Sequence, residues 1–83
     1  TQIGKDTLIE KNSVVKGPVI IGDGCRISDS CIGPYTSIGN NCEIVKAEIT
    51  DSVVMDDVSI VNGGRIIDSL IGRGVKIVKK NQL

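Results

Sequence analysis

The chain has 83 residues, of which 40% are hydrophobic, yet it contains no Trp, no Phe and a single Tyr. A globular core normally needs aromatic bulk, so this composition favours an architecture with a narrow core. The 10 basic and 10 acidic residues form no runs, which argues against a nucleic-acid-binding tail or a patch for anionic membranes. No apolar run approaches the ~20 residues that span a bilayer, and the first residues lack a signal-peptide pattern. We therefore expect a cytoplasmic protein without a nucleic-acid or membrane partner.

Isoleucine or valine recurs every five or six residues along almost the whole chain, a period that fits neither an α-helix nor a meandering sheet. Glycine often follows the aliphatic residue, as in Ile38-Gly39, and a small residue often stands four places after it, as at Cys42. This unit is typical of the hexapeptide repeat of a parallel β-helix, in which three units form one triangular coil. The pattern predicts a single all-β domain over residues 1–83.

In chain order, the aliphatic residues fall in rotation on three faces of a triangular prism. The steps are six residues long as far as Ile27, and several later steps shorten to five. Complete coils of 17 residues are therefore expected over 15–32, 32–49 and 49–66. At about 4.8 Å between coils, nearly five coils would make a rod roughly 20 to 25 Å tall. The predicted buried columns are Ile3, Ile21, Ile38, Val54 and Ile71 on the first face; Val15, Ile32, Ile49 and Ile66 on the second; and Ile9, Ile27, Ile44, Ile60 and Ile77 on the third.

The position after each first-face aliphatic predicts a corner of the prism. Met55 occupies this position in one coil, and glycine occupies it in the others. Glycine fits a corner that needs permissive backbone dihedral angles or leaves no room for a side chain. Polar pairs such as Asp23-Gly24 follow and support the same corner. The four glycines are Gly4, Gly22, Gly39 and Gly72.

The sequence contains no histidine. Proteins with this repeat include acyltransferases in which His is the general base, and carbonic anhydrases in which His ligates zinc. Both activities would lack their usual central group here. We predict that the 83 residues contain no catalytic residue, no cofactor site and no metal site.

Cys25 and Cys42 stand 17 residues apart at the small inward position of the same face, which predicts buried structural thiols. Cys31 falls in a shortened step, where the register is ambiguous. A zinc site is a weaker interpretation because no CxxC motif or His partner accompanies the cysteines. A disulfide is disfavoured in the cytosol.

Three Asp-Ser pairs each lie inside a five-residue step and could suggest a carboxylate cluster for a metal ion or a phosphate. Only two of them stack on one corner, and Asp-Ser is a common tight-turn dipeptide. Turns are the favoured interpretation. The pairs are Asp29-Ser30, Asp51-Ser52 and Asp68-Ser69.

One apolar feature is expected on the outside of the prism. After the buried aliphatic of the third face, the last three coils carry Val45, Val61 and Val78. Because side chains alternate in direction along a strand, these residues should form an outward column, the valine column. Apolar surface stripes often mark contacts, although single surface valines are ordinary. We predict that the valine column is a docking or oligomer seam.

Three segments resemble the carboxy-terminal β-helix of the long-form glucose-1-phosphate thymidylyltransferases. They are ISDSCIGPYTSIGNNCEI over 27–44, EITDSVVMDDVSI over 48–60 and RIIDSLIGRGVKI over 65–77. The resemblance implies a left-handed coil and side-by-side association of prisms around a threefold axis. It also implies an amino-terminal Rossmann-like domain that transfers a nucleotidyl group from dTTP to a sugar 1-phosphate with magnesium. The glycine-rich loop of that domain, G-x-G-T-R-L, has no counterpart in these residues.

We therefore expect a carboxy-terminal fragment of a longer chain. Its expected function is that of a non-catalytic assembly domain of a sugar-1-phosphate nucleotidyltransferase in dTDP-sugar synthesis, with magnesium only in the catalytic domain. The expected partners are its own amino-terminal catalytic domain and further copies of itself, as a trimer or, second in order, a dimer. The alternative is a stand-alone hexapeptide-repeat acyltransferase or an inactive relative of one.

Overall fold

A computed structural model describes residues 1–10 and 12–79. These residues form short β-strands joined by tight turns and contain no helix, and thus no helix able to cross a membrane. The strands are β1 (Gln2–Ile3), β2 (Leu8–Ile9), β3 (Val14–Val15), β4 (Val19–Ile21), β5 (Arg26–Ser28), β6 (Cys31–Ile32), β7 (Thr36–Ile38), β8 (Glu43–Thr50), β9 (Val53–Val54), β10 (Ser59–Ile67), β11 (Leu70–Ile71) and β12 (Lys76–Val78).

Every strand pairs in parallel with the strand one coil away, as a β-helix requires. The first face contains β1, β4, β7, β9 and β11 in that order. The third face contains β2, β5, the first halves of β8 and β10, and β12; the second face contains β3, β6 and the second halves of β8 and β10.

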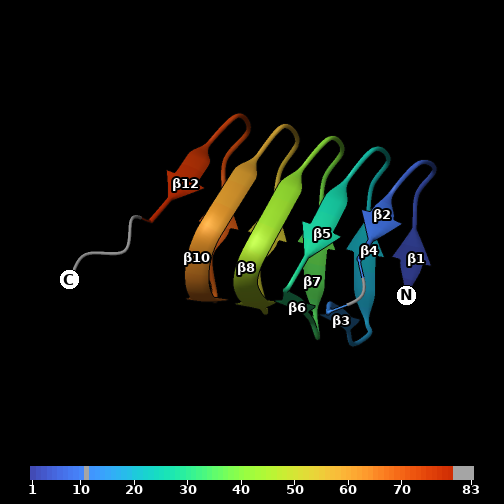
Figure 1. Cartoon of the computed structure of the whole chain (residues 1–83). Helices are drawn as coiled ribbons and strands as arrows, with labels where there is room; N and C mark the ends of the chain where they lie inside the picture. The colour runs from blue at the N-terminus through green and yellow to red at the C-terminus, as the bar shows by residue number, and fades with distance from the viewer. Residues whose placement is uncertain (11, 80–83) are drawn as a thin grey trace.

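The coil is left-handed. In Figure 1 the chain advances from right to left, while the strands nearer the viewer, such as β8 and β10, run downwards and those behind run upwards. This is the hand that the resemblance implies, and it is the exception to the right-handed rule for parallel crossovers. The chain completes about four turns, from Ile3 to Ile71, and begins a fifth.

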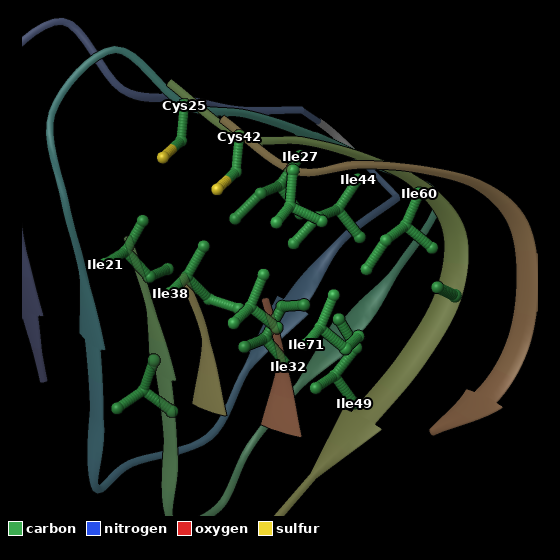
Figure 2. Packing of buried hydrophobic residues seen from close by; sticks show 14 residues of the cluster. Ile21, Cys25, Ile27, Ile32, Ile38, Cys42, Ile44, Ile49, Ile60 and Ile71 are labelled. Atoms are coloured by element: carbon green, nitrogen blue, oxygen red, sulfur yellow. The ribbon is translucent and has the colours of Figure 1, made fainter. Parts of the chain in front are cut away.

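The strand register confirms the three predicted columns. On the first face Ile38 pairs with Ile21 in one neighbouring coil and with Val54 in the other. The second and third faces continue in the same way, for example from Ile32 to Ile49 and from Ile27 to Ile44. Figure 2 shows these side chains stacked toward one interior. Burial of each such isoleucine contributes about 1.5 to 3 kcal/mol, so a narrow core without aromatic residues suffices.

Three glycines of the first corner, Gly4, Gly22 and Gly39, are required for space rather than for backbone conformation. Gly22 does not have a positive φ, but a Cβ atom there would collide with Asn40 Oδ1 and with the backbone of Gly39. Asn40 occupies that space because its Oδ1 accepts a hydrogen bond of 2.8 Å from the N–H of Asp23. Asp56 accepts an equivalent bond of 2.8 Å from the N–H of Asn40. The corner is therefore a ladder of side-chain oxygens that bridge successive coils.

Positive φ angles occur two residues beyond the corner position that glycine or Met55 occupies, at residues that tolerate the left-handed region. Asn41 has φ 57° and Asp57 has φ 60°, and the equivalent position in another coil is Gly24, with φ 68°. Asn, Asp and Gly are the residues that adopt this conformation most readily. The corner thus needs glycine where space is limited, and Asn, Asp or Gly two residues later where the backbone is left-handed.

Candidate assembly surface

The valine column lies on consecutive rungs of the third face. In the register of β5, β8, β10 and β12, Ser28 lies beside Val45, Val45 beside Val61, and Val61 beside Val78. Val45 and Val61 are half-buried, while Val78 in the last coil is 61% exposed. The structure therefore brings the three predicted residues together in one line, with its exposed surface concentrated toward the last coil.

A polar groove lies across the corner that follows the valine column. It has a volume of about 570 Å³, is open to solvent and is lined in part by Asp29, Lys46 and Cys31. Glu48 and Arg65 also line it and form an ion pair of 3.4 Å between Oε2 and Nε. Because both partners are largely exposed, this pair adds little to stability. The groove separates the apolar column from the charged second face.

Sequence reasoning missed a second apolar column, on the first face. The outward residues of β4, β9 and β11 are Ile20, Val53 and Leu70, and all three are exposed, Leu70 by 72%. They are more exposed than Val45 and Val61. The sequence does contain a signal for this column: in three coils, the residue just before the buried first-face aliphatic is itself apolar.

The cysteines occupy two different environments. Cys25 and Cys42 are buried free thiols, as predicted, and their side chains point into the coil beside the isoleucine columns in Figure 2. Their sulfur atoms lie 3.0 Å from the Gly39 carbonyl oxygen and 3.1 Å from the Met55 carbonyl oxygen, respectively. A hydrogen-bonding contact with the Cys25 side chain, together with burial, raises the pKa of Cys42 above the ordinary 9.0. Cys31 is exposed, and its register places it outward on the second face.

The Asp-Ser pairs form turns, as predicted. Asp51 has φ 51°, and the Ser52 hydroxyl donates a hydrogen bond of 2.8 Å to the carbonyl oxygen of Thr50. The same oxygen of Ser52 accepts a bond of 3.1 Å from the N–H of Ser69 in the next coil. Among the residues that the structure describes, no three His, Cys, Asp or Glu side chains gather as a metal site would require.

Comparison with known proteins places this geometry in a family. Residues 1–31 match the family model for the bacterial transferase hexapeptide (six repeats). The chain is 47% identical over 68 residues to a glucose-1-phosphate thymidylyltransferase of Streptomyces antibioticus, a match that covers 82% of this chain and 19% of the relative. The chain is a hexapeptide-repeat domain. It is homologous to the carboxy-terminal part of the glucose-1-phosphate thymidylyltransferases, as the resemblance predicted.

Two further relatives extend this relationship. The thymidylyltransferase of Streptomyces griseus is 42% identical over 67 residues, covering 81% of this hexapeptide-repeat domain and 19% of the relative. The bifunctional protein GlmU of Carboxydothermus hydrogenoformans is 33% identical over 93 aligned positions, covering 90% of the domain and 21% of the relative. The domain thus spans about a fifth of the length of these relatives. No solved structure was found to match it.

Proposed function

We propose that this hexapeptide-repeat domain is a non-catalytic assembly domain of a sugar-1-phosphate nucleotidyltransferase of the glucose-1-phosphate thymidylyltransferase type, acting in dTDP-sugar synthesis. Its partners are the amino-terminal catalytic domain of its own polypeptide and further copies of the domain. Magnesium belongs to the catalytic domain, and the β-helix holds no cofactor. The cytoplasm is the compartment in which we expect it.

The valine column is the observation that carries this proposal. Val45, Val61 and Val78 lie on consecutive rungs of a rigid parallel stack, so their spacing of about 4.8 Å repeats along the rod. A regular apolar line of this kind can pack along its length against a second rod, whereas scattered valines cannot. A cyclic arrangement of three rods would bring the same line of each copy against its neighbour, and a twofold dimer is the second arrangement.

Two further observations support a role without chemistry of its own. The sequence contains no His, the residue most often used as a general base. The relatives named as thymidylyltransferases are about five times as long as the matched segment. We therefore assign nucleotidyl transfer to the part of the polypeptide outside these 83 residues.

Light scattering on the Val61→Lys variant tests the assembly seam. We expect a trimer for the unchanged chain and a monomer for Val61→Lys, because each copy would bring an unpaired ammonium group into an apolar contact. Val14→Lys is the matched control, since Val14 is an exposed valine of β3 on the second face, and it should leave the trimer intact. An unchanged oligomer in Val61→Lys, or a monomeric wild type at high micromolar concentration, would remove the seam from the proposal.

Activity assays on the same purified chain separate this proposal from the alternative. The name of the matching family model, bacterial transferase hexapeptide, favours a stand-alone acyltransferase as the second candidate. We expect neither acyl transfer from acetyl-CoA to an amino sugar nor nucleotidyl transfer from dTTP to a sugar 1-phosphate. Turnover above the uncatalysed background in either assay would overturn the non-catalytic assignment.

A further inference from the structure

The first face has an outward surface without charge. Its five outward positions are occupied by Gln2, Ile20, Ser37, Val53 and Leu70. The equivalent positions of the third face include Arg26, Glu43 and Lys76, and those of the second face include Glu48 and Arg65. Depletion of charged residues distinguishes the centre of a protein interface from ordinary surface.

Two large exposed side chains and two open grooves border the same face. Tyr35, the only aromatic residue of the chain, flanks it on one side, and Met55 flanks it on the other; both are exposed. An open groove of about 310 Å³ lies between Tyr35 and Ile20. A second of about 460 Å³ lies beside Val53 and Met55, and Asp56 and Arg73 also line it. Tyrosine is one of the residue types that most often dominate the binding energy of an interface.

The size of this face indicates the kind of partner. Five rungs spaced by about 4.8 Å and three residues of about 3.3 Å each give a projected area on the order of 250 Å². A stable complex of two separate proteins buries about 800 Å² per partner, but contacts between domains of one chain begin at about 600 Å² in total, or about 300 Å² per side. A partner on the same polypeptide can bind through so small a surface because the linker keeps its effective concentration near the millimolar range.

We infer that the uncharged first face is the docking surface for the nucleotidyltransferase domain of the same polypeptide, an inference that rests on the proposed function. The domain matches only about 19% of the length of the thymidylyltransferases, so most of such a protein lies outside it and is available as the partner. Tyr35 and Leu70 are the anchors, and Ile20 and Val53 complete the contact. Because the valine column lies on the third face, docking and self-assembly use different surfaces and can occur together.

Hydroxyl-radical footprinting of the full-length protein tests the docking surface through Met55 and Tyr35, two reactive side chains on its flanks. We expect both to lose most of their oxidation relative to the same peptides in the unfolded protein. Val53→Lys should restore their oxidation, because a lysine in the centre of the face opposes an apolar contact. Ile67→Lys is the matched control, since Ile67 and Val53 are each 46% exposed and Ile67 lies at the end of β10 on another face.

Three outcomes would overturn the inference. If Met55 and Tyr35 are oxidised freely in the wild-type protein, nothing covers the face. If their protection disappears on dilution to monomers, a second copy of the chain covers it. If the parent polypeptide carries no nucleotidyltransferase domain, the proposed function fails as well, whereas an active nucleotidyltransferase with a freely oxidised face removes only the docking surface.

Discussion

The central coils and the terminal coils are built from the same six-residue unit but bury it to different extents. Ile38, in a central coil, is 1% exposed, while Ile3, in the same column of the first coil, is 47% exposed. Val58 is buried at the small inward position of the third face, while Val75, one coil further, is exposed. Nothing in the local sequence distinguishes these residues, because burial in a solenoid is provided by the coils on either side. Equivalent substitutions in the two regions should therefore have unequal effects.

The largest difference is expected for a charge placed in the first column. Ile38→Asp buries an unpaired carboxylate between Ile21 and Val54 and should cost on the order of 3 to 5 kcal/mol of unfolding free energy or unfold the domain. Ile3→Asp should cost much less, because water reaches that position. Thermal melts of both variants, with the exposed Lys46→Asp as a further control, measure the difference. Similar melting temperatures for Ile38→Asp and Lys46→Asp would show that the register is wrong.

A smaller difference is expected at the corner glycines. Gly22→Ala directs a methyl group against Asn40 and Gly39, and overpacking of this kind costs about 1 to 3 kcal/mol. Gly72→Ala meets only Val75 Cγ2, at 4.0 Å, and does not have a positive φ. Alanine there should be neutral or stabilise slightly by restricting the unfolded chain. Chemical denaturation of the two variants measures this difference. Equal denaturation midpoints for Gly22→Ala and Gly72→Ala would contradict the explanation that the oxygen ladder requires glycine at position 22.

The smallest effect depends on pH and involves Cys42. Because its pKa is raised in the folded state, the thiol keeps its proton at pH values where the unfolded chain ionises near 9.0. The contribution of the Cys42 thiol to the unfolding free energy should therefore fall as pH rises above 9, by up to about 1.4 kcal/mol per pH unit. Cys42→Val, which repeats the residue type of Val58 in the next coil, should reduce this fall. Cys31→Ala is the control, since the exposed thiol should leave the pH profile unchanged.

Much of the architecture could be predicted from the sequence, because a repeat of fixed length leaves few ways to stack. The columns through Ile38, Ile32 and Ile44, the buried position of Cys25 and Cys42, and the turns at the Asp-Ser pairs all follow from spacing. The register of β10 against β8 was harder to foresee. Asn62 and Gly63 stand opposite the single residue Lys46, so one coil is longer than its neighbour at that corner. A Cβ at Gly63 would strike Ile60 Cγ2, which explains why the longer corner contains glycine.

The candidate site was predictable only in part. Spacing alone placed Val45, Val61 and Val78 on one line, and the register confirms that alignment. It did not reveal that Val45 and Val61 are half-buried, or that Leu70 and Ile20 are more exposed than these two valines. Exposure depends on how neighbouring rungs and corners cover a side chain, and a one-dimensional pattern does not contain that information.

The sequence by itself determined the repeat, the inward and outward alternation and the lack of histidine among these residues, because these depend on residue type and on distance along the chain. Only the tertiary structure decided which glycines are required for space, since the atoms that would collide with a Cβ at Gly22 belong to Gly39 and Asn40, 17 and 18 positions later. It also decided that the outward positions of the first face are uncharged across five coils and apolar in three of them, because residues 17 or so apart become neighbours only after the chain has coiled. The physical reason is the same in both cases: in a solenoid, nearly every contact that matters is made between coils rather than within them.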